Sequence, residues 1–412
     1  MKIIVLKFGG TSVGTLDRIV KISKIIVSFI EKKYKVIVVT SAMSGVTNEL
    51  IKKAEKISKN FPNSERDVLL STGEQMASAL IAGKLGDLGF RSRSWMSWQI
   101  PIVTKGNYSS ARIIKIGTDQ IKKYLKKGGT PIITGFQGLN TENRITTLER
   151  GGSDASAIML AKFFKAKKCI IYTDVEGVYT TDPKLTKKAK KIKVLSYEEM
   201  LEMSSLGAKV MQPASIQDAK LNKVNIDVKS SFTNKSGTQI IGRKKIKDIN
   251  IIRGVSFTKN DAKVSLLGVK DKPGVAAAIF EPLYKNSINV DMVVQNISSD
   301  GKETDLTFTI KSDDLLKTKK LISKNKKIRF KKLIVDKNVA KVSIVGVGMI
   351  TTPGVTYRMF QALANKKINI LVISTSEIKI SVLIQSKNLK KSVELLHKEF
   401  NLNKWAIESL EI

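Results

Sequence analysis

Through residue 241, short runs of β-branched residues alternate with segments of helical spacing, and loops rich in glycine and hydroxyl side chains follow most of these runs. The first such unit has a strand over 2–6, a loop over 7–14 and a helix over 16–30. When helices connect successive strands, the strands form a parallel sheet with helices on both faces. Ligands bind such sheets at the carboxyl ends of the strands, so we expect the loops to converge on one crevice.

The same pattern continues along the chain. Gly73 lies inside a predicted long helix, where glycine costs up to ~1 kcal/mol relative to alanine, so we expect a neighbouring segment to approach closely there. Single strands are also predicted over 36–39 and 168–173, a strand and bend over 91–102, a strand that runs into a glycine turn over 131–138, and strands joined by a turn over 225–241. The other predicted helices cover 49–60, 64–88 and 155–164.

Residues 7–14, Lys-Phe-Gly-Gly-Thr-Ser-Val-Gly, are suited to holding a phosphate group. Glycines let backbone N–H groups approach an anion, and the N-terminus of the following helix adds partial positive charge. Lys7 adds a full charge. The spacing of a Walker A loop is absent. A tight strand-to-helix connection without a ligand explains the same residues equally well.

Charged groups in the later loops complement a small zwitterion and a nucleotide. Arg150 suits a carboxylate and Glu74 suits an ammonium group, so we predict a substrate that carries both. Asp154 has two interpretations, a helix N-cap or a residue that orients the substrate. Asp174 and Asp182 lie in a loop with two turns and are candidates to face Mg²⁺ or ribose hydroxyls.

The formal net charge of +36 raises the question of nucleic-acid binding. A dedicated nucleic-acid surface concentrates arginine and aromatic residues in one patch. Here lysines are spread along the whole chain on predicted helix faces. A compositional preference for lysine on solvated surfaces is the simpler explanation, and we expect no nucleic-acid partner.

Several features predict a cytoplasmic protein. No run of 18 or more apolar residues occurs, so no membrane span is expected. The N-terminus has the pattern of a strand, not of a signal peptide. Cys169, the single cysteine, cannot form an internal disulfide and is interpreted as an inert core thiol. His397, the single histidine, lies on a terminal helix and is interpreted as a surface or core residue, not as a catalyst.

Two stretches in the last third of the chain repeat each other. Strands over 263–269 and 341–347 are each followed by a Pro-Gly turn, a helix and an Ile-Asn strand, at an offset of about 80 residues. Each copy has the order of a small ferredoxin-like α+β module. We predict domains at 1–245, at 263–335, and at 251–262 plus 338–412. The repeat suits effector binding, although structural duplication or a dimer surface is the alternative.

Five ordered motifs together resemble the aspartate kinases of the amino acid kinase fold. They are Lys7–Val13, Ser-x-x-x-Gly-x-Thr at 41–47, Gly-Glu at 73–74, Arg150–Asp154 and 173–183. The resemblance covers nearly the whole chain, and the C-terminal repeat is similar to a tandem ACT pair. It implies an α/β catalytic domain, with a three-layer α/β/α architecture and a mostly parallel sheet, followed by two ferredoxin-like α+β ACT modules.

The resemblance also implies an activity. ATP, with Mg²⁺, would phosphorylate the side-chain carboxylate of L-aspartate to 4-phospho-L-aspartate, the first step towards lysine, threonine and methionine. Lysine or threonine would inhibit through the ACT pair, which would also assemble a homo-oligomer. Lys7 resembles a lysine that stabilises charge on the transferring phosphoryl group, and Asp154 resembles a residue that organises the centre. No residue is assigned as a metal ligand.

The resemblance assigns three sets of binding residues. For ATP they are Lys7, Phe8, Gly9, Gly10, Ser41, Thr173, Asp174, Tyr179, Asp182 and Lys209. For aspartate they are Ser41, Thr47, Glu74, Phe136, Arg150, Gly151, Gly152, Ser153 and Asp154. For the effector they are Asp271, Gly274, Val275, Ala276, Asn289, Asp291 and Gln295.

Glu149 departs from the family pattern, which has glycine before the arginine. The acid either pairs with Arg150 and competes with substrate, or points to solvent. We predict that Glu149→Gly changes the KM for aspartate less than about threefold. The alternative functions are phosphorylation of glutamate, carbamate or a nucleotide by another member of the fold family, and a non-catalytic amino-acid sensor on a kinase scaffold.

Overall fold

The computed structural model describes residues 2–149, 151–206, 210–246, 250–297, 303–325 and 327–404. These residues form two compact units, and each is described by itself. The first unit comprises residues 2–178, 191–205 and 210–246, and the second comprises residues 179–190, 206 and 250–404. Within these ranges, no helix combines the length and the apolar character needed to cross a bilayer.

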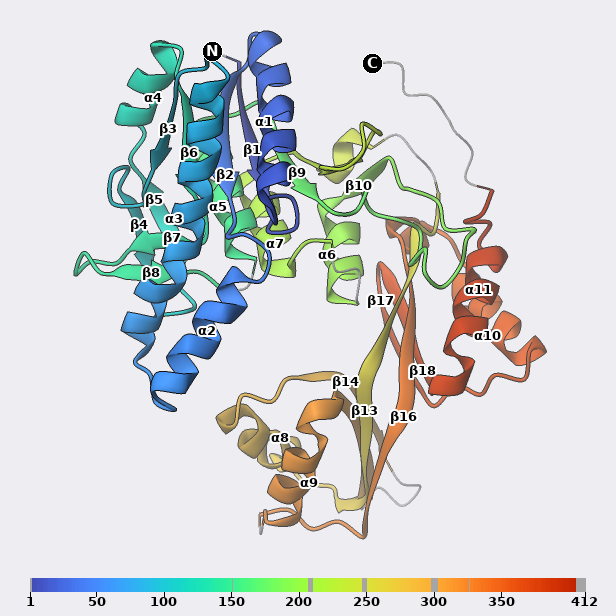
Figure 1. Cartoon of the computed structure of the whole chain (residues 1–412). Helices are drawn as coiled ribbons and strands as arrows, with labels where there is room; N and C mark the ends of the chain where they lie inside the picture. The colour runs from blue at the N-terminus through green and yellow to red at the C-terminus, as the bar shows by residue number, and fades with distance from the viewer. Residues whose placement is uncertain are drawn as a thin grey trace. The chain divides into compact units, whose positions relative to one another are not determined.

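An eight-stranded sheet forms the centre of the first unit (Figure 1). Neighbouring strands are parallel except for one antiparallel pair, β11 with β12, which confirms the predicted mostly parallel sheet. The strand order is β10 (Val194–Ser196), β12 (Thr238–Ile241), β11 (Ile226–Ser230), β9 (Cys169–Thr173), β1 (Ile3–Phe8), β2 (Lys35–Thr40), β6 (Thr130–Thr134) and β3 (Ser92–Trp95).

Successive side chains of a strand point to opposite faces of the sheet, so the apolar side chains of these strands need helices to cover them. Leu6 and Phe8 of β1 pack into one core cluster with Ile19 and Ile22, while Lys7 points towards the helix that begins at Gly152. Thr15 caps the first helix by accepting a hydrogen bond from the backbone N–H of Arg18 at 3.3 Å. The helices are α1 (Leu16–Glu31), α2 (Val46–Ile57), α3 (Asn63–Asp87), α4 (Asp119–Lys126), α5 (Gly152–Phe163), α6 (Tyr197–Ser205) and α7 (Pro213–Asn222).

A second, four-stranded sheet in this unit was not predicted. Its order is β5 (Arg112–Ile116), β4 (Ile102–Lys105), β7 (Gln137–Leu139) and β8 (Ile145–Thr147). The strand predicted to run into a glycine turn over 131–138 is present, since β6 ends at Thr134 and the chain turns at Phe136, whose φ of 68° is left-handed; the start of β7 at Gln137 was not expected. The predicted strand and bend over 91–102 are also present, since Ser92–Trp95 is extended in β3 and the chain turns before β4 begins at Ile102.

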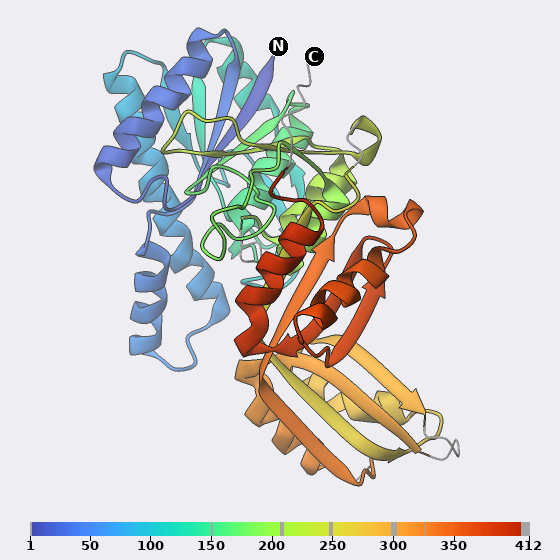
Figure 2. The same cartoon turned by 90° about the vertical axis from the view of Figure 1, so that its right-hand side faces the viewer.

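The second unit is built on one six-stranded sheet with the order β14 (Val290–Ile297), β15 (Glu303–Lys311), β13 (Gly254–Lys270), β16 (Lys332–Val345), β18 (Lys379–Gln385) and β17 (Val372–Ser376). Its helices are α8 (Val275–Lys285), α9 (Leu315–Ser323), α10 (Val355–Asn365) and α11 (Leu389–Glu399). Figure 2 shows α10 and α11 side by side along the sheet.

The two halves of this unit have the predicted repeat of strand, helix, two strands and helix. Gly274 and Gly354 occupy equivalent turns, with φ of 89° and 86°, directly before α8 and α10. The separate strands expected over 251–259 and 263–269 are instead one continuous strand, β13, which pairs with β16 from Gly254 to Leu267. The expected C-terminal strand over 406–412 lies outside the described residues. The domain boundaries stay our proposal.

Candidate active site

Four neighbouring strands of the large sheet, β9, β1, β2 and β6, end in loops that meet. Glycines show how closely the loops approach. A Cβ atom on Gly10 would lie 3.0 Å from the carbonyl oxygen of Ala42, and one on Gly135 would lie 2.9 Å from that of Thr40 and 2.9 Å from Cβ of Ser153. The loops after β1, β2 and β6 and the start of α5 therefore share one site, as expected for a parallel sheet.

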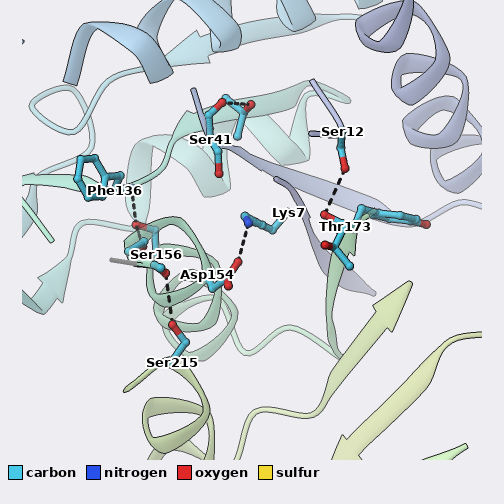
Figure 3. Close-up of polar contacts among 12 residues, drawn as sticks. Lys7, Ser12, Ser41, Phe136, Asp154, Ser156, Thr173 and Ser215 are labelled. Carbon is cyan, nitrogen blue, oxygen red and sulfur yellow. Dashed lines mark hydrogen bonds and ion pairs between the residues drawn. The ribbon is translucent and has the colours of Figure 1, made fainter. Parts of the chain in front are cut away.

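A buried ion pair lies at the centre of this site (Figure 3). Nζ of Lys7 is 2.6 Å from Oδ1 of Asp154, and the two residues are 8% and 7% exposed. A Cβ atom on Gly9 would lie 3.4 Å from Nζ, so glycine leaves room beside the ammonium group. The sequence thus places a fixed cation at the end of β1, where an anion can reach it.

Asp154 is not a helix N-cap, so that interpretation is wrong. Gly151, with φ of 85°, occupies the N-cap of α5, and the backbone N–H of Asp154 donates to its carbonyl at 2.9 Å. Asp154 therefore lies in the first turn of α5, and its carboxylate holds Lys7. The second interpretation, a residue that orients the substrate, stays a prediction.

Glu74 of α3 places a second buried carboxyl group in the site. Oε1 accepts a hydrogen bond from the backbone N–H of Ala42 at 3.1 Å, while Oε2 is buried without a hydrogen-bond partner among the described residues. Burial raises the pKa of Glu74 from 4.5 to about 8, although Lys7 lowers it in part. A Cβ atom on Gly73 would lie 2.8 Å from Cβ of Ala42, which confirms the expected close approach.

The glycine loop after β1 offers fewer free donors than expected. The backbone N–H of Gly9 already donates to the carbonyl of Tyr172 at 3.1 Å. Gly10 and Thr11 are different, because within the described part of the chain their N–H groups have no hydrogen-bond acceptor. Those two amides, rather than that of Gly9, are the donors that this loop can offer an anion.

Hydroxyl groups that the sequence reasoning missed fix the turn at Phe136. The backbone N–H of Phe136 donates to Oγ of Ser156 at 3.1 Å, and that hydroxyl donates to the carbonyl of Gly152 at 2.9 Å. The start of α5 is held in turn by Oγ of Ser215, 3.3 Å from the carbonyl of Gly151. Figure 3 shows the contact between Phe136 and Ser156 of α5. This linkage supports a left-handed backbone that favours glycine.

Asp67, also missed, anchors the segment that leads into the candidate substrate loop. It is fully buried, and its two carboxylate oxygens accept four hydrogen bonds of 2.7–2.8 Å, from the backbone N–H and hydroxyl groups of Ser109 and Thr147. An acid seven residues before Glu74 lies on the same face of α3, which is the sequence signal that could have revealed it.

Other predicted site residues lie at or near these loops. Ser41 is half-buried after β2, whereas Thr47 lies in the first turn of α2 and not in a loop as expected. Oγ1 of Thr173 donates to the exposed carboxylate of Asp174 at 3.0 Å. Tyr179 and Asp182 belong to the second unit, and Arg150 and Lys209 lie outside the described residues. Cys169 is buried in β9, and burial raises its pKa.

The predicted effector residues lie around α8 and β14 in the second unit. Gly274 is the N-cap of α8, whose first residue, Val275, is buried. Asp291 on β14 forms an ion pair with Lys341, which is only 4% exposed. The remaining predicted residues are Asp271, Ala276, Asn289 and Gln295.

The first unit gathers its loops around a buried lysine, and the second unit is a repeated α+β fold, an arrangement that suits a kinase with regulatory modules. Family models agree, since the amino acid kinase family matches residues 2–230 and the ACT domain matches residues 264–325 and 342–400. The chain is 41% identical over 410 residues to the aspartokinase of Bacillus sp. (strain MGA3), which covers 99% of this chain and 100% of the relative.

Solved structures give the same result. Aspartokinase III of E. coli in complex with aspartate and ADP aligns with a TM-score of 0.78 at 25% identity, covering 96% of this chain and 99% of that one. The same enzyme in complex with lysine and aspartate aligns with a TM-score of 0.80 at 25% identity, covering 97% and 100%. The chain therefore belongs to the aspartokinase family and is an allosterically regulated aspartate kinase.

Proposed function

We propose that the chain transfers the γ-phosphoryl group of ATP to the side-chain carboxylate of L-aspartate, giving 4-phospho-L-aspartate and ADP. The observation that carries this proposal is the juxtaposition of the Lys7–Asp154 ion pair, the buried carboxyl of Glu74 and the amides of one glycine loop. The aspartate and ADP bound by E. coli aspartokinase III support the choice of substrates.

Glu74 and Arg150 position the amino acid in this proposal. The ammonium group of aspartate supplies the cation that the buried Glu74 carboxylate lacks, and Arg150 receives the α-carboxylate. Ser41, Thr47, Phe136 and Ser153 line the same pocket. The side-chain carboxylate then points towards the strand ends, where Lys7 lies.

The chemical step needs no general base, because the attacking carboxylate is already ionised at neutral pH. One carboxylate oxygen forms a bond to the γ-phosphorus in line, and the bond from that phosphorus to the β–γ bridging oxygen breaks. Lys7 stabilises the negative charge on the transferring group, and Asp154 keeps its ammonium group in place. The products are the mixed anhydride and ADP, so charge and atoms balance.

Mg²⁺ would enter with the nucleotide. Magnesium sites of this kind use one or two carboxylates together with phosphate oxygens, and the exposed carboxylate of Asp174 at the end of β9 fits that role. The ion neutralises phosphate charge when bound. The proposed nucleotide contacts are Lys7, Phe8, Gly9 through its lack of a side chain, Gly10, Ser41, Thr173, Asp174, Tyr179, Asp182 and Lys209.

The second unit is proposed to bind lysine or threonine and to inhibit the reaction, which opens the route to lysine, threonine and methionine. The lysine complex of E. coli aspartokinase III supports this choice. The edge strands β14 and β17 leave backbone groups available for pairing between copies, which supports a homo-oligomer. A cytoplasmic location stays a prediction.

A coupled ADP-release assay with a panel of acceptors tests the proposal. We expect turnover with L-aspartate and none above background with glutamate, carbamate or a nucleoside monophosphate. Turnover with another acceptor alone would overturn it in favour of a different member of the fold family. Adding millimolar lysine and threonine, singly and together, tests regulation, and unchanged activity in all three cases would contradict the effector proposal.

A further inference from the structure

The segment over residues 179–190 connects two parts of the first unit but packs as part of the second. Val178 before it and Lys191 after it belong to the first unit, whereas Tyr179–Lys190 belongs to the second. The segment contains Tyr179 and Asp182, two of the proposed nucleotide contacts. The contacts that fix the position of this segment should therefore influence nucleotide affinity.

Thr180 is the best-held residue of the segment. It is fully buried; its N–H donates to the carbonyl of Lys190 at 2.8 Å, and its carbonyl accepts from the N–H of Val255 at 2.7 Å. Its hydroxyl accepts from the N–H of Lys190 at 2.9 Å and lies 2.8 Å from Nε2 of His397. Every polar group of Thr180 has a partner, and two of the partners come from the regulatory sheet and helix α11.

His397 occupies this contact as a neutral imidazole. It is 2% exposed, and burial together with the charge of Lys188 lowers its pKa to about 4. We assign the proton of the neutral ring to Nδ1, so that the Thr180 hydroxyl accepts from the N–H of Lys190 and donates its own proton to Nε2.

The turn that follows Thr180, over residues 182–185, is held by its own hydrogen bonds and by packing against the second unit. The Asp182 carboxylate accepts from the N–H of Lys184 at 2.8 Å, and its carbonyl accepts from the N–H of Leu185 at 3.0 Å. The Leu185 side chain packs against the core cluster of the second ACT module, which includes Met359 of α10. The turn that presents Asp182 is therefore shaped between one buried hydrogen bond and one apolar contact.

We propose that His397 is a positioning residue for the nucleotide, which acts through Thr180 by fixing the segment that carries Tyr179 and Asp182. This inference rests on the proposed function, because it takes these two residues as nucleotide contacts. It gives the single histidine a role that its sequence position did not suggest. It also makes nucleotide affinity depend on a helix of the regulatory module.

His397→Leu removes the acceptor while keeping an apolar side chain in the buried site. We expect the KM for ATP to rise about tenfold, or about 1.4 kcal/mol, with kcat and the KM for aspartate within about twofold of the native values. His397→Gln, which can still accept from the Thr180 hydroxyl, should restore most of the loss. Thr180→Val should mimic His397→Leu, and the double variant should be no worse than either one.

Ile322→Ala is the matched control, because it removes a buried side chain of α9 from the other core cluster of the second unit, which contacts neither Leu185 nor His397. It should lower Tm and leave the KM for ATP unchanged. Amide hydrogen exchange adds a readout other than activity: His397→Leu should speed exchange over residues 179–190, and Ile322→Ala should not.

The outcomes separate this inference from the proposed function. If folded His397→Leu keeps the native KM for ATP and native exchange over 179–190, while the native protein phosphorylates aspartate, the positioning role is wrong. The positioning role is also wrong if Ile322→Ala raises the KM for ATP as much as His397→Leu does. If the native protein fails to phosphorylate aspartate but exchange over 179–190 still responds to His397→Leu, then His397 does fix the segment through Thr180, and the proposed function is wrong.

Discussion

We predict that Glu74 makes aspartate binding depend on pH in the neutral range. Burial raises its pKa from 4.5 to about 8, a difference that costs the ionised form about 5 kcal/mol. At pH 7 the free enzyme therefore holds this carboxyl about nine-tenths protonated. Only the ionised form pairs with the ammonium group of the substrate, so binding must first remove the proton.

The size of the effect follows from this pKa. The KM for aspartate should fall about tenfold for each pH unit between about 6 and 7 and should level off above about 8.5. Calorimetry at pH 7 in two buffers with different ionisation enthalpies should show the release of about 0.9 proton per aspartate bound. The KM for ATP, measured in the same series, serves as the internal control and should stay flat.

Glu74→Gln is the decisive variant because it keeps the size of the side chain but cannot ionise. We expect it to abolish both the pH slope and the proton release, and to raise the KM for aspartate at pH 8.5. A native KM for aspartate that is constant from pH 6 to 8.5 would refute the pairing of Glu74 with the ammonium group. A slope that persists in Glu74→Gln would assign the titration to another residue.

Four further predictions concern single sites. Lys7→Met should lower kcat by about 100-fold or more in steady-state assays, because the variant removes charge stabilisation from the phosphoryl group, and a loss below about threefold would contradict this role. Asp67→Ala should lower the free energy of unfolding by about 3 kcal/mol in urea denaturation, since it leaves two buried donors of Thr147 and two part-buried donors of Ser109 without an acceptor; a change under ~1 kcal/mol would show that the network reorganises. Glu149→Gly should change the KM for aspartate less than about threefold, and a much larger fall would show that the acid obstructs the pocket. The pKa of about 4 for His397 lies below its ordinary value of 6.5, so the unfolded chain binds the proton first as pH falls. Stability should therefore be complete above about pH 6.5 and should drop by about 3 kcal/mol by pH 4 from this group; His397→Gln should flatten that part of the curve.

The fold was predictable because its signals are local. Buried strands such as β1 are runs of apolar residues, and the glycines that follow them permit the close approach of loops that the structure shows at Gly10 and Gly135. The rule that parallel strands present their loops at one edge then brings Lys7, Glu74 and Asp154 together, without any knowledge of distances.

The parts of the fold and the site that were not predicted depend on contacts between residues far apart in the sequence, which local patterns do not record. Asp67 accepts hydrogen bonds from Ser109 and Thr147, 42 and 80 positions away, and Thr180 meets His397 across 217 positions. The Gly9 amide was expected to face a phosphate group but bonds to Tyr172, because the sheet continues one residue beyond β1.

The account rests on an aspartate side chain and a nucleotide meeting beside Lys7. Trapping the product with hydroxylamine tests that claim most directly, because an acyl phosphate forms a hydroxamate and an ordinary phosphate ester does not. We predict one aspartyl hydroxamate for each ADP released by the native protein, and no hydroxamate above background from Lys7→Met. ADP release without hydroxamate, or hydroxamate formation that survives the loss of Lys7, would contradict the account.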